Sequence, residues 1–80
     1  MEQNGGTPSQ FLATRIRALR TGRGWSAREL ADRCIALGQR TLTRGTIAKI
    51  EHNIRGAVTF DEAVVLAAAF GVALTDLAPP

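Results

Sequence analysis

Hydrogen-bonding side chains gather in a short segment that also has the spacing of a helix. Ile47 and Ile50 lie three positions apart, so they fall on one face of a helix over about residues 44–52. The rest of that helix surface is small, basic or hydroxyl-bearing: Arg44, Gly45, Thr46, Ala48 and Lys49. Guanidinium, ammonium and hydroxyl groups donate to the acceptors on a base edge, and a small residue permits close approach. The segment predicts a helix that can be inserted into a groove of a nucleic acid.

The residues before this helix fit a defined helix start. Thr43 can act as the N-cap, because a threonine hydroxyl accepts a hydrogen bond from an N–H group of the first turn. Leu42 and Ile47 occupy the two positions of a hydrophobic staple, which fixes the angle at which the chain enters a helix. We therefore expect a capped helix with a fixed entry angle.

The net charge of +3 hides an uneven distribution. Residues 10–57 hold all ten basic residues and three of the seven acidic ones, a balance of +7. Residues 58–80 hold three acidic residues and no basic one, a balance of −3, and Glu2 supplies the remaining −1. Positive charge around the predicted helix is the footprint expected for a polyanion partner. An ordinary arginine-rich surface is the alternative, and charge alone does not separate the two.

Length and composition favour one all-α domain. Eighty residues are near the size at which a single core is only just sufficient. The apolar fraction is 45%, aromatic residues make up 5%, and thirteen alanines favour closely packed helices over a β-sandwich or barrel. No apolar run approaches the roughly 18 residues of a membrane span, and the N-terminus lacks the regions of a signal peptide. We therefore expect a cytoplasmic protein with no membrane contact.

Residues that build metal sites and active sites are sparse. Cys34 is the single cysteine and His52 the single histidine, so neither an internal disulfide nor a set of zinc ligands can be assembled. The spacing of Cys34 predicts a core residue, with a redox sensor as the alternative. His52 is expected to be solvated, with a phosphate contact as the alternative. We find no nucleophile elbow, carboxylate pair or phosphate-binding glycine loop, and we expect no catalysis, no metal and no cofactor.

The chain divides into an arm, one domain and a tail. Residues 1–8 are expected to form a flexible arm, residues 9–78 the domain, and residues 79–80 a tail in which two prolines cannot continue a helix. Five helices are expected in the domain. The first spans residues 10–21 after a cap at Ser9, the second spans residues 27–37 after a capping box of Ser26 and Glu29, and the third spans residues 44–52. The fourth is a central apolar helix that is opened by a capping box of Thr59 and Glu62 and ended by Gly71, and the fifth is a last turn capped by Thr75.

Four separated runs occur together in the order of a known family. They are IRALR at 16–20, WSARELA at 25–31, TIAKIE at 46–51 and LAAAFGV at 66–72. With these runs, residues 11–78 resemble the Cro and phage-repressor (Xre-type) DNA-binding domain. The resemblance implies a compact five-helix bundle of the lambda-repressor-like DNA-binding type, with a helix-turn-helix formed by its second and third helices. It also implies a regulator of transcription such as a repressor, usually a dimer or part of a larger regulator.

The resemblance also implies roles for individual residues. Base contacts fall on Arg44, Gly45, Thr46 and Lys49. Phosphate contacts fall on Ala27, Arg28, Arg40, Asn53 and Arg55, with plain solvation as the alternative for Arg40 and Arg55. Arg20 and Glu51 take the positions of an ion pair between the first and third helices, with two independent solvated charges as the alternative. The chain departs from the family at Ala27, where glutamine is frequent, at Gly45, and in a turn lengthened by Gln39 and Arg40.

These expectations combine into one function. We expect a sequence-specific regulator of transcription that binds double-stranded DNA by inserting the helix of residues 44–52 into the major groove. A homodimer and a protein partner are both left open. The alternative is a protein-interaction module such as an antitoxin, with DNA binding secondary, and exposure of Leu74 and Leu77 on the last helix would favour it.

Overall fold

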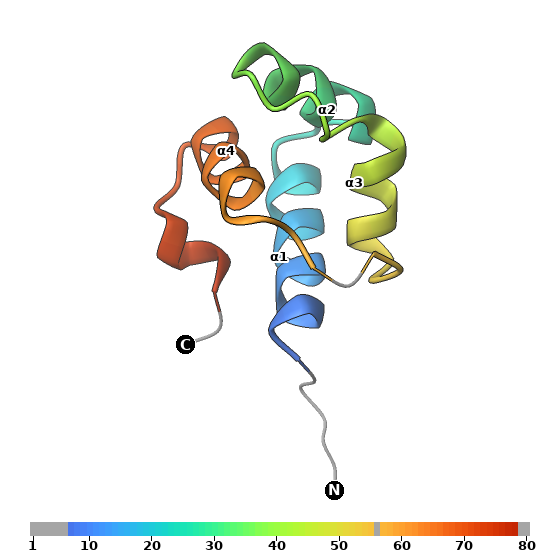
Figure 1. Ribbon diagram of the computed structural model, residues 1–80, viewed down its shortest axis with the longest axis vertical. Helices are drawn as coiled ribbons and strands as arrows, with labels where there is room; N and C mark the ends of the chain where they lie inside the picture. The colour runs from blue at the N-terminus through green and yellow to red at the C-terminus, as the bar shows by residue number, and fades with distance from the viewer. Residues whose placement is uncertain (1–6, 56, 79–80) are drawn as a thin grey trace, which may run out of the picture.

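The computed structural model describes residues 7–55 and 57–78, and most of both stretches is helical (Figure 1). The elements are α1 (Pro8–Gly22), α2 (Ala27–Ala36), α3 (Arg44–Glu51), α4 (Phe60–Phe70) and the 3₁₀ helix η1 (Leu74–Leu77). These stretches contain no strand, which confirms the all-α prediction. They contain four α-helices, so the five-helix count is not confirmed, and η1 takes the place of the fifth. Over the same residues, no helix combines the length and apolarity that crossing a bilayer requires.

A hydroxyl side chain precedes each of these α-helices and accepts a hydrogen bond from the backbone N–H three residues further on. The caps are Thr7, Ser26, Thr43 and Thr59, of which the last three were predicted. The predicted cap at Ser9 is wrong, because Pro8 suits the first helical position and Gln10 completes a capping box with Thr7. Helix α1 therefore begins two residues earlier than predicted, and residues 1–6 of the predicted arm lie outside the described residues.

Two further details of the predicted helix starts were wrong. The Glu29 carboxylate pairs with Arg33 one turn further on, at 3.1 Å, rather than completing a box at the α2 cap. Thr75 lies inside η1, and the carboxylate of Asp76 accepts the N–H of Ala73 at the start of that turn, at 3.1 Å. The ends of α2 and α3 each come one residue earlier than predicted. These differences move boundaries without changing the order of the elements.

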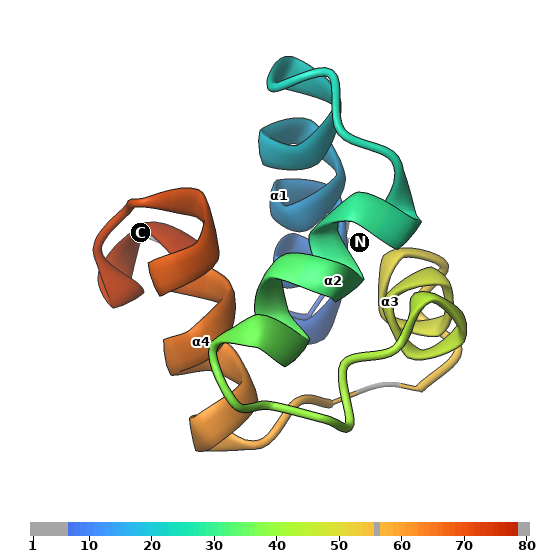
Figure 2. The ribbon, with the colours of Figure 1, turned by 90° about the horizontal axis from the view of Figure 1, so that it is seen from above.

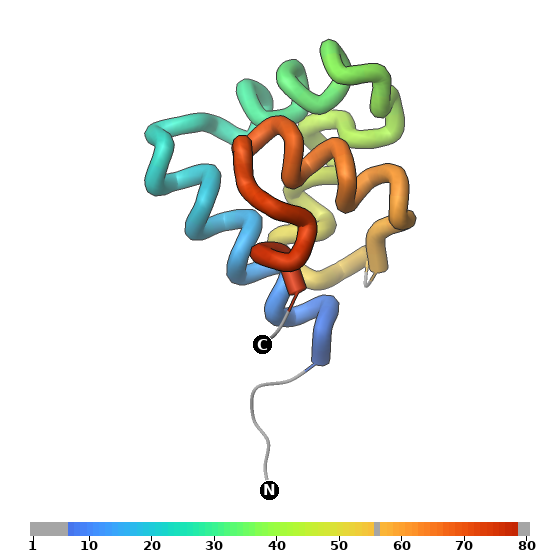
Figure 3. Tube along the Cα trace, turned by 90° about the vertical axis from the view of Figure 1, so that its left-hand side faces the viewer, coloured from blue at the N-terminus to red at the C-terminus, as the bar shows by residue number. Residues whose placement is uncertain are grey.

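The core lies between the four α-helices. The side chains at its centre are at most 1% exposed: Ile16, Leu30, Cys34, Leu42, Ile47 and Leu66. Helix α3 packs on α1 and α2, whereas α4 packs on α2 and η1. Figures 1 and 2 show α3 and α4 on opposite sides of α1, and Figure 3 shows η1 (red) against α1 (blue), with which it is in contact. The face of α3 that points away from α1 and α2 is therefore left uncovered.

We predict that Thr7→Ala lowers the free energy of unfolding by about 1 kcal/mol, because it removes the hydroxyl that caps α1. Ser9→Ala is the matched control, since Ser9 lies inside the first turn and should change stability much less. Urea denaturation of the two variants compares them directly. A larger loss for Ser9→Ala than for Thr7→Ala would contradict the assignment of the cap.

Candidate nucleic-acid interface

Helix α3 presents two different faces. Ile47 and Ile50 are 1% and 5% exposed and belong to the core. On the other side, Arg44, Gly45 and Lys49 are exposed. Thr46 is half-buried between the two faces. The structure thus leaves three of the four residues expected to contact bases exposed on one helix, with Thr46 at the border of its buried face.

The first turn of α3 is fixed by two threonine hydroxyls. The Thr43 hydroxyl oxygen accepts the backbone N–H of Thr46 at 3.2 Å, and the same hydroxyl donates to the Oγ1 of Thr46 at 3.1 Å. The first bond satisfies one of the N–H groups that a helix start leaves without a partner. The second orients the Thr46 hydroxyl and leaves its own proton available to an acceptor outside the protein.

Gly45 is not required by packing. A Cβ added there would meet only the Oγ1 of Thr43, at 4.0 Å, which is an ordinary van der Waals distance. Glycine nevertheless costs up to about 1 kcal/mol of helix propensity relative to alanine. The lack of a side chain at Gly45 therefore leaves the backbone of α3 open to close approach from outside, at a cost that the fold does not require.

Four basic residues on and near α3 have no ion-pair partner among the described residues. Arg28 in the first turn of α2, Arg40 in the turn, and Arg44 and Lys49 on α3 are exposed and make no ion pair with another described residue. Exposed and uncompensated guanidinium and ammonium groups are the groups that neutralise phosphate. These four side chains form the basic rim of the candidate interface.

Two other residues expected to contact phosphate lie beside helix ends. Ala27 is half-buried in the first turn of α2, behind the cap at Ser26, where N–H groups are free to face an anion. Asn53 follows α3 with φ of 56°, a left-handed conformation that asparagine tolerates better than most residues, and its N–H bonds to the Ile50 carbonyl at 3.0 Å. Ala27 and Asn53 thus lie at the start of α2 and just after the end of α3.

The Arg55 side chain is paired with a carboxylate of the same chain. Its guanidinium forms two parallel contacts with the Glu62 carboxylate, Nη1 to Oε2 at 3.0 Å and Nη2 to Oε1 at 2.9 Å. The Arg55 side chain is 30% exposed and that of Glu62 only 1%. Phosphate contact by Arg55 remains a prediction, but any phosphate must compete with this ion pair.

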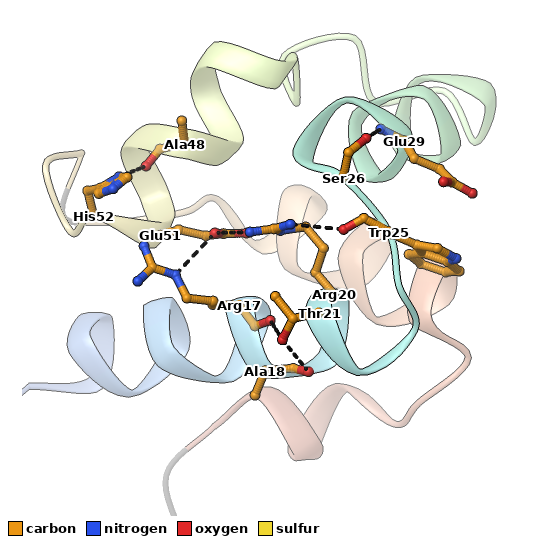
Figure 4. Close-up of polar contacts among 10 residues, drawn as sticks. All are labelled: Arg17, Ala18, Arg20, Thr21, Trp25, Ser26, Glu29, Ala48, Glu51 and His52. Atoms are coloured by element: carbon orange, nitrogen blue, oxygen red, sulfur yellow. Dashed lines mark hydrogen bonds and ion pairs between the residues drawn. The ribbon is translucent and has the colours of Figure 1, made fainter.

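The structure brings Arg20 and Glu51 together, as the dashed lines in Figure 4 show. Arg20 donates from Nε to Oε2 at 2.6 Å and from Nη2 to Oε1 at 2.8 Å. Its remaining nitrogen, Nη1, donates to the Trp25 carbonyl at 2.9 Å. The Arg17 Nε adds a longer contact to Oε1 at 3.4 Å. One guanidinium thus joins α1, the residues before α2 and the last residue of α3.

Burial and pairing act in opposite directions on the Glu51 carboxyl. Burial raises its pKa, because a low-dielectric environment disfavours the charged form. Hydrogen bonds and positive charge from Arg20 and Arg17 more than offset this, and the pKa is lowered overall. Glu51 is therefore an ionised carboxylate inside the fold, and it depends on its arginine partners.

Sequence reasoning recognised Glu62 only as part of a capping box. In the structure its carboxylate also accepts a hydrogen bond from the Thr41 hydroxyl at 2.6 Å, in addition to the Arg55 contacts. The one available signal was an acidic residue at the start of a largely apolar helix, which needs partners when buried. The identity of those partners depends on the tertiary arrangement.

Two further sequence predictions, for Leu74 with Leu77 and for Cys34, concern apolar residues, and Trp25 is a further apolar side chain. Leu77 is 5% exposed and belongs to the core, whereas Leu74 is 38% exposed. Cys34 is fully buried, and desolvation raises the pKa of its thiol to about 11, which fits the core role. Trp25 stacks on Phe70, with ring centroids 5.8 Å apart and planes 9° from parallel. It therefore contributes to packing beside the start of α2.

Comparison with known families agrees with this geometry. A family model described as Helix-turn-helix matches residues 16–77, well over half of the chain. The matched stretch contains α2, the turn and α3, together with Arg20 and Glu51. The chain matches no curated protein and no solved structure.

We predict that Arg20→Ala lowers the free energy of unfolding by about 3–5 kcal/mol, because it leaves the buried Glu51 carboxylate without its main partner. Arg17→Ala is the control, since that side chain is 49% exposed and should cost less than about 1 kcal/mol. A double-mutant cycle of Arg20→Ala and Glu51→Ala by chemical denaturation measures the coupling. Additive effects of the two single substitutions would show that the pair contributes no interaction.

Proposed function

The chain belongs to the Cro/C1-type helix-turn-helix family of DNA-binding domains, and from this premise we propose a sequence-specific regulator of transcription that inserts α3 into the major groove of duplex DNA. The observation that carries the proposal is the division of α3 into a buried face and an outer face. Ile47 and Ile50 hold the helix on the core, while Arg44 and Lys49 are exposed on the other side.

The outer side chains suit base recognition in different ways. We assign guanine reading to Arg44, because its planar fork can donate to O6 and N7 of one base. Thr46 offers an oriented hydroxyl, and Lys49 one turn of helix later offers an ammonium group. Gly45, between Arg44 and Thr46 in the sequence, permits the helix backbone to lie close to the base edges. Together they form a surface that can discriminate sequence rather than only bind charge.

Affinity independent of sequence is assigned to Arg28 and Arg40 of the basic rim and to the start of α2. Arg28 in the first turn of α2 and Arg40 in the turn before α3 are exposed and lie within the segment whose charge balance is +7. The amides near Ala27 add the dipole of a helix start, which favours a phosphate group. In this proposal these groups set the position of the protein on the duplex and the strength of binding, while α3 sets the preference for a base sequence.

We include a homodimer in the proposal for a geometric reason. An eight-residue helix is only about 12 Å long, so one copy contacts few base pairs and two copies are needed for a long site. Phe60 and Val64, four residues apart on α4, are 71% and 41% exposed and offer apolar surface for a protein contact. The same exposure favours the second candidate, a protein-interaction module such as an antitoxin that binds DNA secondarily.

We predict that the chain binds random-sequence duplex DNA with an affinity that falls steeply with salt. The slope of log K against log salt should be about −0.9 for each phosphate neutralised. Fluorescence anisotropy of a labelled duplex at several salt concentrations measures it. Absence of binding at low salt, or a flat titration, would reject DNA binding as the function.

Base reading is tested by selecting binding sites from a random duplex library with wild type, Arg44→Ala and Arg28→Ala. Arg44→Ala should cost about 1–3 kcal/mol on the preferred site and relax one base position. Arg28→Ala, the control, should weaken all sequences alike and leave the selected motif unchanged. A dimer should select two half-sites about one helical turn apart. An unchanged motif for Arg44→Ala would contradict the role of α3.

A further inference from the structure

The buried carboxylate of Glu62 is bonded to segments on both sides of α3. Its side chain is 1% exposed, and the carboxylate accepts three hydrogen bonds and makes one further ion-pair contact. Oε1 accepts a hydrogen bond from the Thr59 N–H at 2.9 Å and lies 2.9 Å from Nη2 of Arg55 as an ion-pair contact. Oε2 accepts from the Thr41 hydroxyl at 2.6 Å and from Nη1 of Arg55 at 3.0 Å. A helix start on its own would need only the Thr59 bond, so the other contacts serve a different purpose.

On one side, the bond to Thr41 holds the turn that leads into α3. Thr41 lies two residues before the α3 cap, and its hydroxyl also accepts a hydrogen bond from the Gln39 side chain at 2.9 Å. The connection from α2 to α3 runs over residues 37–43, and its apolar anchor is the fully buried Leu42. Glu62 therefore supplies a second, polar anchor for a long connection.

On the other side, Arg55 follows the end of α3. Its backbone N–H bonds to the Lys49 carbonyl at 3.3 Å, beside the bond from Ile54 to the same oxygen at 2.8 Å. Its guanidinium then reaches Glu62 on α4. Arg55 thus connects the carbonyl of a base-reading candidate to a buried carboxylate on another helix.

We infer that Glu62 is a positioning residue that holds the segments on both sides of α3 and keeps the Arg55 guanidinium away from the DNA phosphates. The inference rests on the proposed function and assigns Arg55 to shaping the interface. The charge of Arg55 is compensated within the protein, so Arg55 is not one of the residues that contact phosphate.

The competition between Glu62 and a phosphate favours Glu62. A phosphate would meet Arg55 at the surface, where solvent and salt screen the attraction. Withdrawal of Arg55 would leave a carboxylate that is 99% shielded from water with two neutral donors, and an uncompensated buried charge is strongly unfavourable. Burial raises the Glu62 pKa, but the bonds from Arg55, Thr41 and Thr59 lower it overall, so the group is a carboxylate that requires a cation.

The test compares salt slopes on random-sequence duplex for wild type, Arg55→Gln, Glu62→Gln and the double variant. Arg55→Gln should leave the slope unchanged, because Arg55 makes no phosphate contact. Glu62→Gln should release Arg55 and steepen the slope by about 0.9, the value of one phosphate, and the double variant should restore it. Asp61→Asn is the matched control: it makes the same charge change at an exposed neighbour and should not steepen the slope.

A slope reduced by about 0.9 in Arg55→Gln, with no change in Glu62→Gln, would show that Arg55 grips phosphate and would overturn the inference. Failure of wild type to bind any duplex would instead reject the proposed function. Amide hydrogen exchange without DNA tests the positioning role independently. Glu62→Gln, or Arg55→Gln if the former does not fold, should speed exchange in residues 39–43 and 52–55 more than Asp61→Asn does. Faster exchange confined to the first turn of α4 would show a capping role only.

Discussion

The buried charge of Glu51 is the constraint on which the orientation of α3 depends. A carboxylate inside a small helical domain must have cationic partners, and Arg20 supplies a two-bond contact whose third nitrogen holds the Trp25 carbonyl. The residues before α2 and the end of α3 are therefore fixed to the same point on α1. Because the end of α3 cannot rotate without breaking this contact, the direction of its exposed face is set as well.

Helix α3 needs such contacts because its own helix-forming tendency is weak. It has eight residues, among them a glycine, two isoleucines and a threonine, and isolated helices of this length are not stable in water. Glu51, the last residue of α3, fixes the end of the helix through its contact with Arg20, while Glu62 holds the segments before and after α3. Apolar packing of Ile47 and Ile50 alone would fix which face is buried but would leave the helix freer to slide or tilt. The two carboxylates act at defined distances and limit these movements.

Local features of the sequence were sufficient for much of the fold. The caps at Ser26, Thr43 and Thr59 act within three residues, and the inward positions of Ile47 and Ile50 follow from helical periodicity. The start of α1 was misplaced because two hydroxyl residues compete there, and proline at the first helical position decides between them. The last predicted helix is only a 3₁₀ turn. The Glu62 contacts could not be predicted, because Thr41 and Glu62 are 21 residues apart and meet only through the packing of α2 and α4.

The stacked arrangement around Trp25 gives the domain a built-in optical reporter. This is the only tryptophan of the chain, and its ring lies between Phe70 on α4 and the guanidinium of Arg33 on α2, which is 4.0 Å from the ring centroid. Its environment therefore depends on the contact between α2 and α4 and on the residues just before the α2 cap. Tryptophan emission therefore follows assembly of the domain, so folding can be monitored without an added dye.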